Sequence, residues 1–195
     1  MLYLFMLGRD PELSKLEIES VLENKNIKFE IVDFSKEVVV LNCDKLDSKI
    51  IDEFGGIIKI AEVISSSTRL DQIESALDKV KIYNGTSNKI EYFIDSFSTD
   101  LDSFLHDYLK DYFKGIKVKA LYGKSKEPSK LMNRDILKNG LNFVIFKSYI
   151  GKVIGITNLA EVKNRDLGRP SVDHLKVISI RLAKILVNLS KIKAG

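Results

Sequence analysis

Short apolar runs alternate with helical patterns along this chain, and this alternation constrains its fold more than any other feature. The first 67 residues predict the order β-α-β-β-α-β, which is that of a ferredoxin-like domain. Pro11, after Asp10 as the expected N-cap, marks the start of the first helix, and Gly55-Gly56 ends the second. Strands are expected at Met1–Leu7, Phe29–Phe34, Val38–Leu41 and Ile57–Ile64, and the second helix over Asp47–Phe54.

The pattern continues after a polar run at residues 65–68, which we take as a domain boundary. The clearest helical periodicity follows a cap at Thr99 or Asp100 and ends at Gly115. Its apolar stripe consists of Leu101, Phe104, Leu105, Tyr108, Leu109, Tyr112 and Phe113. Further helices are expected over 69–80 and 129–139, and strands over 92–97, 117–122, 141–149 and 153–159, with a hairpin turn at 150–152. The whole chain therefore predicts an α+β protein.

Charge is distributed unevenly along the sequence. Residues 1–115 hold 14 Lys or Arg and 22 Asp or Glu, a net of −8, whereas residues 116–195 hold 17 and 5, a net of +12. A basic region beside an acidic one is typical of proteins that bind polyanions, although a solvated basic surface has the same composition.

The basic part of the chain supplies the candidate RNA-binding residues. Lys117 and Lys119 are expected on one face of a strand, and the following loop adds two more lysines. On the helix expected over 129–139, basic residues recur at i, i+4 and i+8, which places them on one ridge. The candidate set is Lys117, Lys119, Lys124, Lys126, Lys130, Arg134, Lys138, Arg165 and Arg169. Most aromatic residues lie at core spacings, so base stacking is not expected.

The stretch from Lys163 to Asn188 combines three features. A polar run with Arg165, Asp166 and the sequence Gly168-Arg169-Pro170 is expected to be an ordered loop, in which Asp166 forms local ion pairs. A short tether follows. The last part predicts an amphipathic helix, with Leu182, Ile185, Leu186 and Leu189 on one face and Arg181, Lys184, Asn188 and Lys191 on another.

This stretch resembles the junction between the RNA-binding and catalytic halves of THUMP-domain tRNA guanosine N2-methyltransferases of the archaeal type. The resemblance implies three parts: an N-terminal ferredoxin-like domain over 1–67, a THUMP domain over 68–162, and a linker loop and helix over 163–195. It implies tRNA as the partner, together with a C-terminal methyltransferase domain in cis, or a modifying enzyme in trans. S-adenosylmethionine is then expected as the cofactor of the full-length protein and not of this chain.

The residues themselves indicate no catalytic site. The sequence lacks a Gly-x-x-x-x-Gly-Lys loop and a Gly-x-Gly-x-x-Gly motif, and its three prolines are never adjacent, which excludes the Asn/Asp-Pro-Pro-Tyr/Phe motif of amino-group methyltransferases. His106 and His174 are the only histidines, so no metal site is expected, and His106 is interpreted as a surface residue. The single cysteine, Cys43, excludes an intramolecular disulfide and favours a reducing, cytoplasmic compartment.

Three functional hypotheses follow. In the first, this chain positions tRNA for methylation by a domain that follows it, and the chain ends where such a domain is expected to begin. In the second, it is a stand-alone THUMP adaptor that presents tRNA to a separate enzyme. In the third, it is a protein–protein interaction domain whose basic part faces an acidic partner.

Overall fold

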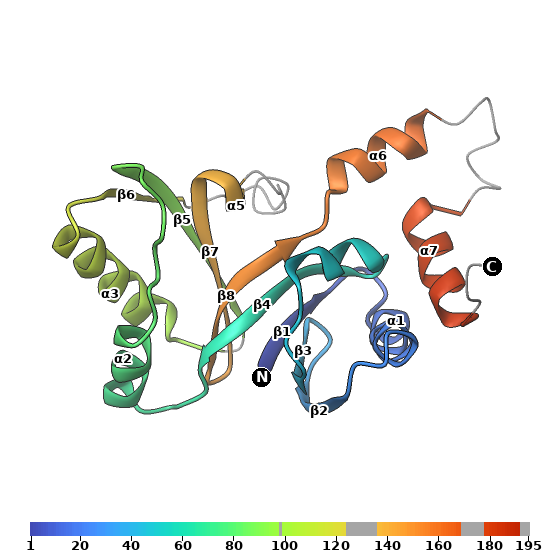
Figure 1. The fold of residues 1–195 in the computed structure, drawn as a ribbon, viewed down its shortest axis with the longest axis horizontal. Helices are drawn as coiled ribbons and strands as arrows, with labels where there is room; N and C mark the ends of the chain where they lie inside the picture. Colours follow the sequence, from blue (N-terminus) through green and yellow to red (C-terminus); the bar gives the residue numbers. More distant parts are fainter. Residues whose placement is uncertain (98, 124–135, 169–177, 192–195) are drawn as a thin grey trace. The chain divides into compact units, whose positions relative to one another are not determined.

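The structure is a computed structural model that describes residues 1–97, 99–123, 136–168 and 178–191. It is a mixed α+β fold, which confirms the predicted fold class (Figure 1). The chain divides into two compact units. Unit 1 consists of Met1–Ile60 and Gly155–Gly195, and unit 2 of Ala61–Ile154. The domain boundaries expected at residues 67 and 162 stay a prediction.

Unit 1 has the predicted β-α-β-β-helix-β order, with a 3₁₀ helix as its second helix. Its strands lie in the order β2-β3-β1-β4. The elements are β1 (Leu2–Leu7), α1 (Pro11–Asn24), β2 (Phe29–Phe34), β3 (Val38–Cys43), η1 (Ser48–Glu53) and the start of β4 (Ile57–Ser65). Antiparallel pairing of β3 with β1 and β2 aligns Leu4 with Val40. Every residue from Tyr3 to Leu7 is buried, because this central strand is covered on both faces.

Two more helices belong to unit 1, α6 (Leu159–Leu167) and α7 (Ile180–Leu189). The predicted loop around Arg165 and Asp166 is therefore wrong, because both residues lie in α6. Asn158 caps this helix: its Oδ1 accepts a hydrogen bond from the Glu161 backbone N–H at 3.2 Å, and its Nδ2 donates to the Glu161 carboxylate at 3.1 Å. Asparagine is among the preferred N-cap residues, so the sequence already contained this start signal.

Unit 2 follows the predicted helix–strand–helix–strand–helix–strand–strand order. It is formed by α2 (Leu70–Asp78), β5 (Lys89–Phe97), α3 (Asp102–Gly115), β6 (Lys119–Tyr122), α5 (Ile136–Asn139), β7 (Gly140–Phe146) and β8 (Tyr149–Ile156), whose last residues belong to unit 1. The strand order is β8-β7-β5-β6, so β6 is the edge strand of this unit. Strand β5 pairs in parallel with β6 and β7, and β7 pairs antiparallel with β8.

The predicted hairpin turn at Ile150-Gly151-Lys152 is wrong. Phe146 pairs with Tyr149, so the turn consists of Lys147 and Ser148, and Gly151 pairs with Val144 within the strands. Lys147 has φ 52°, the left-handed backbone that two-residue hairpin turns require. Glycine usually occupies such a position, so the sequence pointed to the wrong residues.

The helix α3 buries its apolar stripe against the strands of unit 2. Its Leu105, Leu109 and Phe113 lie in one core cluster with Tyr92 of β5 and Phe143 of β7. Figure 1 shows α2 and α3 on the same side of these strands. The helix ends at Gly115, as predicted, and a turn at Ile116 and Lys117 follows it. Among the described residues, no helix has the length and apolar content needed to cross a membrane.

Candidate nucleic-acid interface

The end of α3 places a lysine in a special backbone conformation. Val118 N–H bonds to Phe113 O at 3.0 Å and Lys117 N–H to Lys114 O at 3.2 Å, the two bonds of a Schellman motif. Lys117 occupies the left-handed position of this motif, with φ 57°. The expected strand over 117–122 therefore starts two residues later, at Lys119, and Lys117 does not share a strand face with it.

Lys119 lies opposite another lysine on the neighbouring strand. In the parallel register of β5 and β6, Lys119 lies directly opposite Lys89, and both side chains are exposed. Like charges at directly paired positions destabilise a sheet by a few tenths of a kcal/mol. A bound anion would remove this repulsion. Such a local conflict is expected at a functional site rather than at a purely structural one.

Four exposed lysines thus gather at one end of the unit 2 strands. The last turn of α3 contributes Lys114, and the turn after this helix contributes Lys117. The first residues of β5 and β6 contribute Lys89 and Lys119. We call these four residues the basic edge. Sequence reasoning included Lys117 and Lys119 but missed Lys89 and Lys114, because only the strand register and the helix end bring them to the same place.

The two helices that cover the other side of the core are acidic. Between them, α2 and α3 carry the exposed carboxylates Asp71, Glu74, Asp78, Asp102, Asp107 and Asp111. Helix α2 has no lysine or arginine. Helix α3 also carries the exposed Lys110 and Lys114, so the excess of carboxylates is largest on α2, and a polyanion is expected to prefer the basic edge to α2.

The remaining candidate residues fall into two groups. Lys138 is exposed on α5, just before β7, and the pairing of Glu91 with Gly140 places it at the same end of β5 as Lys89. Five candidate residues lie outside the described part of the chain, four of them in unit 2 and Arg169 in unit 1. The four in unit 2 are Lys124, Lys126, Lys130 and Arg134. The ridge expected on the helix over 129–139 stays a prediction.

Arg165 of unit 1 has a local partner. It forms an i, i+4 ion pair with Glu161 on α6, and both side chains are exposed. Pairs of this kind contribute at most about 1 kcal/mol, so the guanidinium can exchange this partner for a phosphate at little cost.

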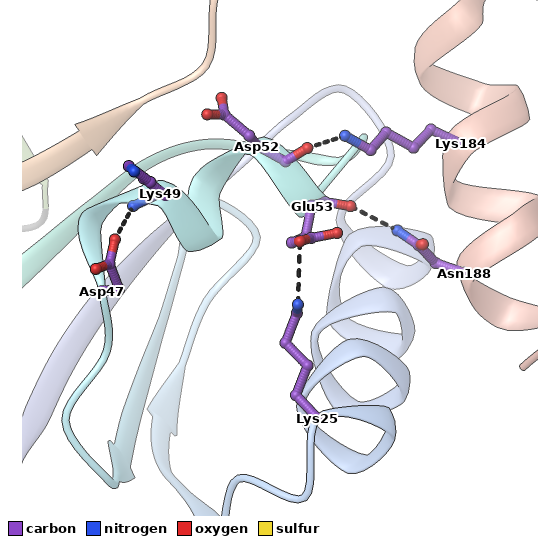
Figure 2. Close-up of polar contacts among 7 residues, drawn as sticks. All are labelled: Lys25, Asp47, Lys49, Asp52, Glu53, Lys184 and Asn188. Carbon is purple, nitrogen blue, oxygen red and sulfur yellow. Dashed lines mark hydrogen bonds and ion pairs between the residues drawn. The ribbon is translucent and has the colours of Figure 1, made fainter. Parts of the chain in front are cut away.

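The basic residues of α7 hold the helix on unit 1. Arg181 Nε donates to Gly55 O at 2.6 Å, Lys184 Nζ donates to Asp52 O, and Lys191 pairs with Glu23 at 2.7 Å. Figure 2 shows Lys184 and Asn188 pointing from α7 to η1. These cations therefore serve the fold of unit 1.

A buried carboxylate lies at the centre of this contact. Glu17 of α1 is 0% exposed, and its two oxygens accept the backbone N–H groups of Gly55 and Gly56 at 2.8 and 2.7 Å. Asn188 Nδ2 donates to the same carboxylate at 2.7 Å and to Glu53 O at 2.9 Å. A side chain at Gly55 would collide with Arg181 O, so the close approach of α7 requires glycine there.

The apolar stripe expected on α7 is only partly covered. Ile185 is 4% exposed, whereas Leu186 and the neighbouring Val187 are 47% and 61% exposed. The helix therefore contacts the rest of unit 1 through Ile185 as well as through Arg181 and Asn188, and part of its apolar surface stays accessible.

Comparison with solved structures identifies the fold. The crystal structure of PH1313 from Pyrococcus horikoshii Ot3, a THUMP-domain protein, matches 77% of this chain with a TM-score of 0.50 and 9% sequence identity. The chain has a THUMP-like fold. The match spans 53% of PH1313, so this chain covers about half the length of that protein.

A crystal structure of a 4-thiouridine synthetase–RNA complex with bound ATP matches 78% of this chain and 40% of the synthetase, with a TM-score of 0.43 and 9% identity. No protein-family model matches the sequence, and no curated protein matches it either.

Proposed function

We propose that this chain is an RNA-binding module that holds tRNA through its phosphates. The observation that carries this proposal is the exposed Lys89–Lys119 pair at the centre of the basic edge, on a unit whose α2 and α3 are acidic. Phosphate contacts fix the orientation of a nucleic acid without reading its sequence, which suits a module that positions an RNA for another site.

The finer proposal concerns what the module positions. The resemblance of residues 163–189 to the junction of THUMP-domain tRNA guanosine N2-methyltransferases supports an S-adenosylmethionine-dependent methyltransferase domain as the partner in cis. In this proposal the cofactor and the methyl transfer belong to that domain, and this chain supplies only the grip on tRNA.

A stand-alone adaptor is the second candidate. The exposed Leu186 and Val187 on α7 favour a docked partner, and a separate modifying enzyme would use the same surface as a domain in cis. Both candidates require tRNA binding, whereas a protein–protein interaction domain does not.

Binding to unmodified tRNA, measured by gel shift across a salt series, tests the proposal. The variant Lys89→Glu/Lys117→Glu/Lys119→Glu should weaken binding and reduce the slope of log K against log[salt] by roughly 2–3 units, since about three phosphate contacts are lost. The matched control, Lys36→Glu/Lys45→Glu/Lys79→Glu, changes the same number of exposed lysines outside the basic edge and should retain the wild-type slope.

Two further variants locate the rest of the interface. Lys124→Glu/Lys126→Glu/Lys130→Glu/Arg134→Glu/Lys138→Glu tests the expected loop and ridge, and Arg165→Glu/Arg169→Glu tests the segment of unit 1. Equal binding by the wild type and the basic-edge variant would contradict the assignment of the interface. Failure of the wild type to bind tRNA even at low salt would contradict the proposed function.

A further inference from the structure

Three aromatic rings of unit 2 contact one another and are not equally buried. Tyr92 of β5 is 2% exposed, whereas His106 of α3 and Tyr122, the last residue of β6, are partly exposed. The His106 and Tyr122 ring centroids are 4.5 Å apart, and Tyr92 stacks on both rings at 5.9 and 5.3 Å. His106, interpreted from the sequence as a surface residue, is partly exposed and belongs to this ring cluster.

The orientation of His106 is set by a hydrogen bond. The Tyr92 hydroxyl lies 2.9 Å from His106 Nδ1. Burial, with smaller contributions from Tyr122 and Asp107, raises the pKa of Tyr92 to about 12, so this hydroxyl keeps its proton at neutral pH. If Tyr92 donates to Nδ1, the imidazole proton resides on Nε2, which can then donate to a second partner.

The surroundings of the rings differ from those of the basic edge. Two carboxylates, Asp102 and Asp95, lie close enough to Tyr122 to raise its pKa, after burial as the largest cause. They would repel a phosphate but can accept hydrogen bonds from the exocyclic amino group of a base. Lys119 and Tyr122 are three residues apart on one edge strand, about 10 Å at the usual rise. Side chains alternate along a strand, so the two lie on opposite faces of β6, and one RNA that contacts both would pass around this edge.

We propose that Tyr122 and His106 form a stacking site for an unpaired nucleobase of an RNA whose phosphates contact the basic edge. This inference rests on the proposed RNA binding and adds a second kind of contact to it. The basic edge holds the backbone, and the ring cluster holds a base that has left its stack. Aromatic stacking of this kind accepts every base, because each has a π face.

The alternative is that the cluster only packs the core, as Tyr92 and Phe113 do. Those two rings are 2% and 1% exposed, and their centroids are 5.7 Å apart. Tyr122 differs because its ring is only partly buried, on the strand that forms the edge of this unit among the described residues. Its partial exposure at the end of the strand that begins with Lys119 favours a binding role.

A short single-stranded RNA with one 2-aminopurine tests the inference, since stacking quenches the fluorescence of this base. The wild type and Tyr122→Phe, which keeps the ring, should quench it. Tyr122→Leu keeps an apolar side chain in the core and should lose the quenching and about 5- to 100-fold in affinity. The same RNA with an abasic site in place of 2-aminopurine should bind the wild type no more tightly than the intact RNA binds Tyr122→Leu.

The control variant Tyr149→Leu removes a partly exposed ring from β8 and should behave as the wild type. Circular dichroism verifies that each variant is folded. Salt-sensitive RNA binding with equal quenching and affinity for the wild type and Tyr122→Leu would overturn the stacking site and leave the proposed function intact. Absence of any RNA binding by the wild type would overturn both.

Discussion

The Asn188 side chain donates a 2.7 Å hydrogen bond to the buried carboxylate of Glu17, which lies 171 positions earlier in the chain. Ser20 Oγ of the same helix, α1, donates to Asn188 O at 2.6 Å. These contacts, with those of Arg181 and Lys184, make α7 an integral part of unit 1. The helix is therefore expected to contribute to the stability of the fold, whatever follows it in the chain.

Glu17→Gln should lower the free energy of unfolding by about 3 kcal/mol. The substitution removes a buried charge that accepts three hydrogen bonds, and it turns an amide donor toward at least one of the N–H groups of Gly55 and Gly56. Asn188→Ala should lower the free energy of unfolding by about 1–2 kcal/mol, because it removes one hydrogen-bond donor and leaves the Glu17 carboxylate with two others.

Urea unfolding measures both changes. Glu30→Gln, on the exposed face of β2, is the matched control and should change stability by less than about 0.5 kcal/mol. A Glu17→Gln protein as stable as the wild type would show that the carboxylate does not carry the contact between α1 and α7.

Lys117→Gly separates stability from RNA binding. Glycine adopts the left-handed conformation of Lys117 without steric cost, so the melting temperature should rise, by the equivalent of about 1 kcal/mol. The same substitution removes one cation from the basic edge, so tRNA affinity should fall and the salt slope should decrease by roughly 1 unit. Differential scanning calorimetry and gel shifts measure the two effects. A parallel loss of stability and affinity would argue against this description of the turn.

The buried thiol of Cys43 should make the stability of unit 1 depend on pH. Burial raises the pKa of its thiol to about 11 from an ordinary 9.0, with Asp44 adding to the rise and the N-terminal ammonium opposing it. The unfolded state therefore loses this proton first. The stability that the thiol contributes is complete below about pH 9 and is lost as the pH rises through about 11.

Urea unfolding of the wild type and Cys43→Ala across this range should show a steeper decline for the wild type. Native Cys43 should also react slowly with iodoacetamide at neutral pH, because the thiolate is the reactive form. Identical pH profiles for the two proteins would mean that Cys43 does not titrate differently in the folded and unfolded states.

Periodicity was sufficient to predict most elements of this fold. The apolar run Met1–Leu7 became the buried strand β1, and the stripe from Leu101 to Phe113 became the buried face of α3. These patterns are local and reflect burial, which is the strongest determinant of secondary structure in a sequence.

The features that the sequence did not predict depend on contacts between residues distant in sequence, or on local sequence patterns that are weak. The basic edge arises because the register of β5 and β6 pairs Lys89 with Lys119, and no pattern within either strand specifies that register. The turn at Lys147 was missed because a lysine took the backbone conformation usually left to glycine. Glu17 was missed because a carboxylate on an amphipathic helix ordinarily faces solvent. Its donors are Gly55 and Gly56, which follow η1, and Asn188 of α7.

Unit 1 is discontinuous in sequence, and this has a consequence for synthesis on the ribosome. Its first segment ends at Ile60, whereas the residues that satisfy Glu17 include Asn188. At usual translation rates, roughly 10–30 s pass between the synthesis of Glu17 and that of Asn188, 171 positions later. During that interval all of unit 2 is made and can fold, while the N-terminal segment of unit 1 still lacks its contacts with α7. The N-terminal segment of unit 1 is therefore translated before unit 2 but reaches its final structure after it.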